Sequence, residues 1–367
     1  MPYKVFDLPE YPCVRDMWDN LALETRPIVI YGMGNGADKL IRRLDKYGIR
    51  IADIFASDGF VRGHSFHGYR VKSFAEIREE YSDFVILLSF ASNKEDVINM
   101  LESIDEGYDM LVPDMPVAGE EEYFDRDFYN SNYYEIRKAY DALRDAESRY
   151  VFASVINYKL SGRLSYLSSV CSHPDEMYSL LPCHDIITTV DAGAYNGDTV
   201  REAKKYFANL NKVYAIEPDL RNFKKLTKYS EAECDIEIAS INAAAWHENS
   251  VGGFNGSGNR NSTISATASF EHRVGEIKLC TIDSIVNDTI DYIKYDVEGA
   301  EREALIGSHQ TILCNRPCLL VSAYHRSRDI FELVNILSEA YPFYKIYMRR
   351  LRCIPAWELN LLLIPEK

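Results

Sequence analysis

The stretch "TTVDAGAYNGDTV" at residues 188–200 decides the fold of the C-terminal half. Its β-branched start predicts a strand, and the pattern after Gly197 predicts a helix that follows a glycine-containing turn. Glycine adopts backbone angles that a side chain forbids and lets a ligand come close to the main chain. In a doubly wound sheet, ligands bind where the chain passes from strand to helix. The stretch therefore predicts a ligand-binding turn at the carboxyl end of a strand.

Two carboxylates mark this predicted site. Asp191 ends the first strand, and Glu217 of "AIEPD" ends the next one, near the offset at which an acid binds ribose hydroxyls. An acid is unfavourable for a pyrophosphate but favourable for an ammonium group, so the ligand is expected to combine an amino acid with a nucleoside. S-adenosylmethionine meets that description. The third strand, "SINAAAW", ends near Asn242 and Ala243, whose amide side chain and main-chain amide are expected to contact adenine.

The alternation of strands and helices predicts an α/β protein with two doubly wound, Rossmann-like domains joined by a helical connector. A chain of 367 residues with 47% apolar residues exceeds one ordinary core. We expect a small N-terminal domain at residues 1–117, an acidic, tyrosine-rich connector or cap at 118–187, and the second domain at 188–367. The Gly/Ser/Asn-rich stretch from His247 to Glu276 predicts a mobile loop or loose hairpin beside the site, and "YKIYMRR" with "ELNLLLIP" predicts a terminal antiparallel hairpin.

Composition narrows the classes of partner and the compartment. The net charge of −15 and the lack of a basic block disfavour nucleic-acid binding. No tract is apolar enough to span a bilayer and the start of the chain is unlike a secretory signal, so we expect a cytoplasmic protein. The eight cysteines follow no standard zinc spacing and are expected to be reduced.

Several of these motifs together resemble the FkbM-like S-adenosylmethionine-dependent methyltransferases. "VDAGAYNGDTV", "AIEPD", "TIDSI" and "IKYDVEGAEREAL" carry the resemblance, which covers about residues 145–367. It implies a class I methyltransferase fold, S-adenosyl-L-methionine as cofactor, and cofactor contacts from the first two strand ends and the fourth. The implied contacts are Asp191, Gly193, Tyr195, Gly197, Asp198, Thr199, Glu217, Pro218 and Asp296. Where that family often has an acid before a histidine after the fifth strand, this chain has Tyr324-His325.

Methyl transfer to a hydroxyl requires alignment and removal of a proton, and three strand-end residues are candidates for the base. His325 has the most suitable ordinary pKa, while Asp296 and Glu298 follow the fourth strand. Glu298 is equally able to cap the next helix, His325 to be a structural histidine, and Lys294 to pair with a carboxylate across the sheet. No third ligand beside the two carboxylates is evident, so no metal is predicted.

The N-terminal domain carries a glycine turn of its own, "GMGNGA" at residues 32–37, with Asp58 after the second strand. This pattern nearly satisfies a dinucleotide-binding fingerprint. The following "ASDGFVRGHSFHGYRVKSFAEI" resembles the nucleotide-sugar-binding domains that precede sugar acyltransferases, which implies a sugar nucleotide or a docking role. A domain kept for packing or dimerisation is equally consistent with the residues.

The predicted function is O-methylation of a hydroxyl on a sugar, a glycan precursor or a related metabolite. The tyrosines Tyr158, Tyr166 and Tyr178 are candidates for a lid or for core residues, and a homo-oligomer is possible. The alternatives are an NAD-linked or nucleotide-sugar-binding protein that uses "GMGNGA", and a non-catalytic nucleotide-binding scaffold.

Overall fold

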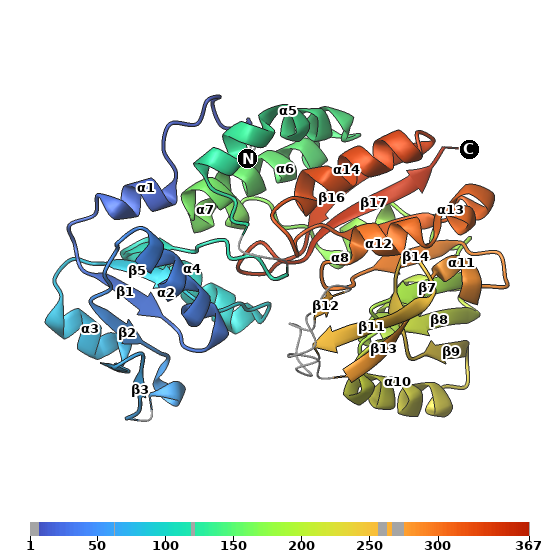
Figure 1. Cartoon of the computed structure of the whole chain (residues 1–367), viewed down its shortest axis with the longest axis horizontal. Coiled ribbons are helices and arrows are strands. Elements are labelled where there is room, and N and C mark those ends of the chain that lie inside the picture. Colours follow the sequence, from blue (N-terminus) through green and yellow to red (C-terminus); the bar gives the residue numbers. More distant parts are fainter. Residues whose placement is uncertain (1–6, 62, 119–121, 256–262, 266–274, 367) are drawn as a thin grey trace.

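The computed structural model describes residues 7–61, 63–118, 122–255, 263–265 and 275–366, and Figure 1 shows two lobes, each built around a β-sheet. The N-terminal sheet has the order β2-β1-β5-β6, and all its pairs are parallel. Its strands are β1 (Ile28–Tyr31), β2 (Asp53–Phe55), β5 (Val85–Leu88) and β6 (Asp109–Leu111). The other elements of this lobe are α1 (Met17–Ala22), α2 (Asn35–Lys46), α3 (Phe74–Glu80), α4 (Glu95–Gly107), the 3-10 turn Asp58–Phe60, and the short pair β3 (Ser65–Phe66) and β4 (Tyr69–Arg70).

The helices of this lobe follow from local sequence signals. Helix α2 turns Ala37, Leu40 and Leu44 into the core, at the spacing of one helical face. Helix α3 begins with a capping box, in which Ser73 and Glu76 each accept a hydrogen bond from the other's backbone N–H. Together with the parallel strand pairs, these helices confirm the predicted parallel α/β arrangement of the N-terminal part.

Helices connect the two lobes, as the tyrosine-rich stretch predicts. They are α5 (Arg126–Ala142), α6 (Ala146–Ser161), α7 (Leu164–Ser168) and α8 (Pro174–Ser179). Asp145 caps the start of α6, and Gly162, with a φ of 67°, ends it in the left-handed conformation. Tyr158 is completely buried and therefore belongs to the core, whereas Tyr178 lines the cavity described below.

The C-terminal sheet has seven strands in the order β16-β17-β15-β14-β7-β8-β9. Its strands are β7 (Thr188–Ala192), β8 (Lys212–Ile216), β9 (Glu237–Ile241), β14 (Tyr292–Tyr295), β15 (Cys318–Ser322), β16 (Tyr344–Arg350) and β17 (Leu359–Pro365). All pairs are parallel except those of β17, which lies antiparallel between β15 and the edge strand β16. The predicted terminal hairpin is thus confirmed. The helices are α9 (Asp198–Tyr206), α10 (Leu220–Ala232), α11 (Ile282–Ile285), α12 (Glu301–Ile306), α13 (His309–Asn315) and α14 (Asp329–Ala340).

The third predicted strand, "IEIASINAAAW", is divided in the structure, which corrects the sequence prediction. Strand β9 ends at Ile241, and β10 (Ala244–Ala245) joins a second sheet of order β10-β13-β11-β12. The break falls at Asn242, whose side-chain amide donates to the carbonyl oxygens of Glu217 and Pro218. In the predicted loop or hairpin, β11 (Ser250–Asn255) pairs antiparallel with β13 (Gly275–Cys280) and with β12 (Thr263–Ser265). Residues 256–262 and 266–274 of that stretch lie outside the described residues.

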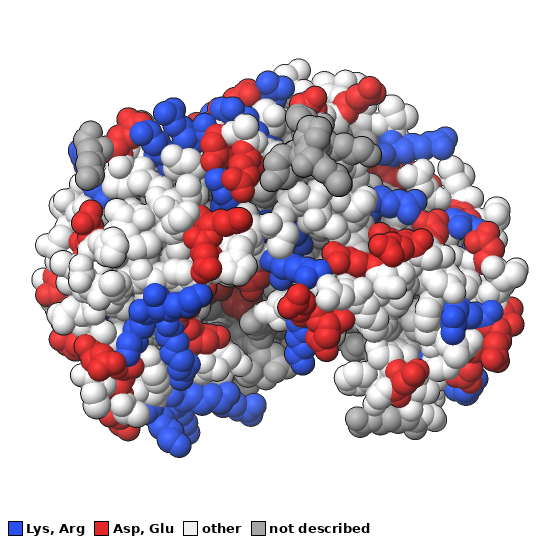
Figure 2. Space-filling model, turned by 180° about the vertical axis from the view of Figure 1, so that it is seen from behind, with Lys and Arg blue, Asp and Glu red and all other residues white. Residues whose placement is uncertain are grey.

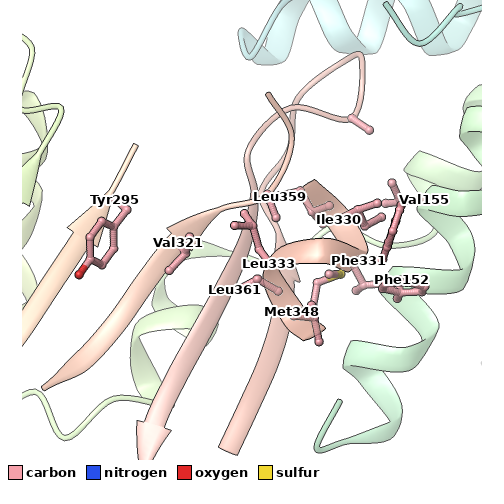
Figure 3. Close-up of a cluster of buried hydrophobic side chains, with 14 of the residues drawn as sticks. Phe152, Val155, Tyr295, Val321, Ile330, Phe331, Leu333, Met348, Leu359 and Leu361 are labelled. Atoms are coloured by element: carbon pink, nitrogen blue, oxygen red, sulfur yellow. The ribbon is translucent and has the colours of Figure 1, made fainter. Parts of the chain in front are cut away.

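A continuous hydrophobic core joins the connector to the C-terminal sheet. Figure 3 shows Phe152 and Val155 of α6 beside Ile330 and Phe331 of α14, close to the strands that carry Val321 and Leu361. In the face shown in Figure 2, acidic and basic side chains are interspersed. Among the described residues, no helix has both the length and the apolar character needed to span a membrane.

Candidate active site

The strand order creates a crevice between β7 and β14. The chain runs from β7 to β8 and β9 on one side, then returns to place β14 on the other side of β7. Such a reversal separates the two strand-to-helix connections and opens space at the carboxyl ends of the strands. A cavity of about 270 Å³ lies there. Its wall includes Tyr178, Gly193, Tyr195, Asp198, Thr199, Glu202, Glu217, Pro218, Asp219, Ala244, Ala245, Lys294, Asp296, Glu298, Tyr324, Leu351, Glu358 and Asn360.

The glycine turn after β7 is fixed by its neighbour strand. Gly193 has a φ of 92°, and a Cβ atom at this position would overlap the carbonyl oxygen of Asp296. The Asp296 N–H in turn donates to the Ala192 carbonyl at 3.0 Å. Glycine is therefore required for the ends of β7 and β14 to approach each other closely.

A buried lysine links the acids of these two strands. Lys294 is the register partner of Asp191, and its Nζ lies 3.7 Å from Asp191 Oδ1 and 3.4 Å from Asp296 Oδ2. Thr199 donates its hydroxyl to Asp191 Oδ2, while Asp191 Oδ1 has no hydrogen-bond partner among the described residues. Burial raises the pKa of Asp191 above its ordinary range, although Lys294 and Thr199 oppose the shift. The lysine prediction is thereby confirmed as a cross-strand pair, and Lys294 also faces the cavity.

Glu217 is held rigidly at the end of β8. Its Oε2 accepts the Tyr195 N–H at 2.9 Å, and its Oε1 accepts the Asp219 N–H at 2.8 Å. Burial raises the pKa of Glu217 to about 8, against the lowering effect of the two N–H donors. The carboxyl group thus ties the turn after β7 to the turn after β8 at the cavity wall.

His325 lies behind the wall rather than in it. Its Nε2 is 3.5 Å from Asp296 Oδ1 and 3.6 Å from Glu298 Oε2, and its Nδ1 is 3.0 Å from Glu301 Oε1. Burial disfavours the charged imidazole, but the carboxylates of Glu301, Asp296 and Glu298 outweigh burial and raise the pKa of His325 to about 10. The sequence argument for His325 as base relied on the ordinary pKa of histidine. Because the three carboxylates raise the pKa of His325, that argument does not apply to the folded protein.

Asp296 remains ionised in the same network. Burial would raise its pKa, but Lys294 and His325 lower the pKa of Asp296 to about 2. Tyr324 also donates its hydroxyl to Asp296 Oδ1 at 3.2 Å. Neither Asp296 nor His325 has the near-neutral pKa of an ideal general base, so the base assignment stays a prediction.

Helix α12 has Ala300 at its N-cap, and the capping alternative for Glu298 stays a prediction. Glu301 Oε1 accepts the Val297 N–H at 2.9 Å and lies 3.4 Å from the Gly299 N–H, while α12 begins only at Glu301. Glu301 is 1% exposed and also contacts His325. Sequence reasoning missed this residue, although it is the last glutamate of the quoted "DVEGAE" segment.

Of the residues predicted to contact the cofactor or the acceptor, most lie in the cavity wall. They are Gly193, Tyr195, Asp198, Thr199, Glu217, Pro218, Asp296 and Glu298. Five predicted site residues do not line the cavity: Asp191, Gly197, Asn242, Ala243 and His325. In place of Asn242 and Ala243, the next two residues, Ala244 and Ala245, line the cavity. The side chain of Asn242 is engaged with main-chain carbonyls, so its role toward adenine stays a prediction.

The cavity has a marked excess of acids. Its wall contains Lys294 and the carboxylates of Asp198, Glu202, Glu217, Asp219, Asp296, Glu298 and Glu358. Such a wall favours a ligand that carries positive charge and disfavours a pyrophosphate.

Comparisons with known proteins agree with this geometry. Residues 191–343 match the model of the methyltransferase FkbM domain. The crystal structure of methyltransferase FkbM from Methylobacillus flagellatus is similar over 98% of this chain and 95% of that chain, with 21% identity and a TM-score of 0.69. That likeness shows a shared fold that includes the N-terminal lobe.

Two further structures are similar at a lower level. An rRNA methylase from Streptococcus thermophilus has 16% identity and a TM-score of 0.33, over 56% of this chain and 98% of its own. The fibrillarin of Aeropyrum pernix with natively bound S-adenosyl-L-methionine has 13% identity and a TM-score of 0.34, over 52% of this chain and 74% of its own. A sequence comparison with curated proteins finds no match.

Proposed function

Because this chain carries a methyltransferase FkbM domain at residues 191–343, we propose that it transfers a methyl group from S-adenosyl-L-methionine to a hydroxyl oxygen. The observation that carries the proposal is the acidic cavity at the switch point between β7 and β14. A sulfonium cofactor with an ammonium group is positively charged at the end that would face Asp198, with Asp191 buried behind the wall, and its ribose offers two hydroxyls to Glu217. The fit rests on the chain's own features: a glycine turn that no side chain could replace, and a buried Asp191 Oδ1 that has no hydrogen-bond partner among the described residues and only a 3.7 Å contact with Lys294.

Each cavity residue has a distinct part in this proposal. Gly193 and Tyr195 would carry the methionine half on the turn after β7, with Thr199 holding Asp191 in place. Glu217, fixed by two N–H bonds, would bind the ribose. Ala244 and Ala245, which form β10 and line the cavity, would pack against the adenine ring.

The cofactor supplies an electrophilic methyl carbon when it is bound. In the transfer a bond forms between that carbon and the acceptor oxygen, the carbon–sulfur bond breaks, and its electron pair stays on sulfur. The chain must align the hydroxyl, exclude water and receive its proton. Asp296 and Glu298 reach the cavity and are the proposed acceptors of the proton, while His325, behind them, positions Asp296.

We propose a sugar, a glycan precursor or a related polyhydroxyl metabolite as acceptor. The carboxylates of Glu298 and Glu358 line the cavity together with Tyr324 and Asn360. Such groups form hydrogen bonds with the hydroxyls of a polyol.

The test is a calorimetric titration of the full chain with S-adenosylmethionine, S-adenosylhomocysteine and NAD in parallel. We expect binding of the first two, and Glu217→Ala should weaken it at least tenfold because two hydroxyl contacts and the tie between the turns are lost. Binding of NAD alone would overturn the proposal. A mass-spectrometric screen of cell extracts with and without the active protein then seeks the acceptor as a product that is heavier by one methylene unit.

A further inference from the structure

A second group of side chains, next to the cavity, has the composition of a metal site. Asp296, Glu301 and His325 each offer one ligand atom, and these atoms all lie within 4.8 Å of one another. They come from three places in the fold: the end of β14, the first turn of α12 and the segment after β15. Glu301 and His325 are fully buried, whereas Asp296 reaches the cavity.

The polar contacts of this group are incomplete among the residues that the structure describes. Glu301 Oε1 is used by the Val297 N–H, but Glu301 Oε2 is buried and has no hydrogen-bond partner among the described residues. His325 Nδ1 lies 3.0 Å from Glu301 Oε1, the oxygen that also accepts the Val297 N–H. A buried carboxylate oxygen without a partner is costly, and such an atom in a native fold calls for an ion or a donor.

The charge around the imidazole points to a cation. Three carboxylates, those of Asp296, Glu298 and Glu301, surround His325 within 3.6 Å, and Lys294 contacts Asp296 alone among them. The buried carboxyl group of Asp329 also interacts with Glu301 and His325, so acids outnumber the single imidazole at this place. A divalent cation that replaces the imidazole proton would neutralise the excess more fully.

We propose that Asp296, Glu301 and His325 bind one divalent cation at the wall of the cavity, with Mn²⁺ as the class of ion that fits best. The two carboxylates favour an ion that prefers oxygen, such as Mn²⁺, and the imidazole disfavours Ca²⁺, which takes an all-oxygen shell. Zn²⁺ also binds imidazole together with carboxylate, so it is the competing ion in the test. The cavity side of Asp296 leaves coordination positions for an acceptor hydroxyl, whose proton the cation would make more acidic. This role rests on the proposed methyl transfer, whereas the binding of the ion does not.

The experiment measures the ion directly on the full chain. After dialysis against EDTA, Mn²⁺ is added in steps and the free ion is followed by electron paramagnetic resonance, with Mg²⁺ and Zn²⁺ as competing ions. We expect one Mn²⁺ per chain. Glu301→Gln and His325→Gln should weaken binding at least tenfold, because each removes one of three protein ligands.

A matched control separates this site from the general acidity of the cavity. Glu202→Gln removes a half-buried carboxylate from the same cavity wall, on α9, and should leave Mn²⁺ affinity within twofold of the parent chain. An equal loss in Glu202→Gln and Glu301→Gln would overturn the proposal in favour of diffuse counter-ion binding.

A spectroscopic measurement on the unaltered chain covers the case in which the variants do not fold. Electron spin-echo modulation of bound Mn²⁺ should show coupling to the nitrogen of one imidazole. Bound Mn²⁺ without nitrogen coupling would refute the site. The absence of stoichiometric binding of Mn²⁺, Mg²⁺ and Zn²⁺ would refute it as well. S-adenosylhomocysteine binding by Glu301→Gln distinguishes the two proposals. If Glu301→Gln loses Mn²⁺ binding but still binds S-adenosylhomocysteine, the metal site is supported independently of the cofactor site. If the unaltered chain does not bind S-adenosylhomocysteine, the cofactor proposal is refuted instead.

Discussion

The chain contains two glycine turns between a strand and a helix, and they differ in what surrounds them. In the N-terminal turn, a Cβ atom on Gly36 would overlap the Ser89 carbonyl oxygen, and one on Gly32 would meet the ring of Phe90. In the C-terminal turn, Gly193 approaches the Asp296 carbonyl, and its open side lines the acidic cavity. The first turn packs against the protein's own strand β5, whereas the second turn also presents a surface to a ligand.

The neighbouring strand ends differ in the same sense. After β2 of the N-terminal sheet, Ser57 bonds to the Tyr31 hydroxyl and Asp58 is exposed. After β7 and β8 of the C-terminal sheet, Asp191 and Glu217 are both buried. In both turns, therefore, the glycines indicate that another part of the chain lies close to the backbone. Only the C-terminal turn also has buried acids beside it, and these indicate a site for a charged ligand.

The largest effect that would test this contrast is expected from alanine at the two glycines. Gly193→Ala places a side chain at a positive φ and against the Asp296 carbonyl, so we expect a loss of about 4 kcal/mol in unfolding free energy. Gly36→Ala overlaps the Ser89 carbonyl and should destabilise comparably. Chemical denaturation measures both losses.

Ligand binding separates these two variants. S-adenosylhomocysteine affinity should fall more than tenfold in Gly193→Ala and stay unchanged in folded Gly36→Ala, at a temperature at which both remain native. Equal losses of affinity would show that the N-terminal turn contributes to the same site.

Much of this contrast could be predicted from sequence, because it depends on residues close in the chain. "VDAGAYNGD" and "AIEPD" combine a strand pattern, a glycine turn and a terminal acid within a few positions, and the parallel sheet then brings the two together. The terminal hairpin was predictable in the same way from two neighbouring apolar runs. Its place beside β15 depends on long-range pairing that periodicity does not encode.

The rest of the site depends on contacts between distant residues. Glu301 acquires its importance from His325, which lies on another segment, and no local pattern distinguishes Glu301 from the other acids of "EGAERE". Likewise, the protonation of His325 follows from three carboxylates gathered in space. Asn242 stood at a strand end as expected, but its amide turned toward main-chain carbonyls and helped to end β9.

The next largest effect concerns the lysine that joins the acids at the cavity. Lys294→Met leaves the buried Asp191 and the partly exposed Asp296 without their cation, so we expect a loss of about 3 kcal/mol in unfolding free energy. Lys212→Met is the matched control, because Lys212 pairs with Glu237 and Asp288 at the surface, where ion pairs contribute little, and it should cost much less than Lys294→Met. Similar losses in the two variants would mean that the acids of the second turn are not held by a buried pair.

A smaller effect is the pH dependence that Glu217 gives to stability. Its pKa of about 8 in the fold lies above the ordinary 4.5, so between these values the folded chain keeps a proton that the unfolded chain releases. Stability from this group is complete below pH 4.5 and is lost as pH rises toward 8. Compared with the parent chain, Glu217→Gln should therefore gain about 3 kcal/mol in relative stability from pH 5 to pH 8. Denaturation curves for the two proteins at several pH values measure it, and parallel curves would contradict the raised pKa.

The smallest effect is expected at the acid of the N-terminal turn. Asp58 is exposed and follows β2 at the position where a dinucleotide-binding domain has its ribose-binding acid, so it is the residue on which the NAD alternative depends. If the first turn serves packing, Asp58→Ala changes the unfolding free energy by less than about 0.5 kcal/mol and leaves S-adenosylhomocysteine affinity as it was. A titration with NAD, NADP and a nucleoside-diphosphate sugar tests the opposite case. Saturable binding of any of these that is lost in Asp58→Ala but kept in Glu217→Ala would give the N-terminal turn a ligand of its own.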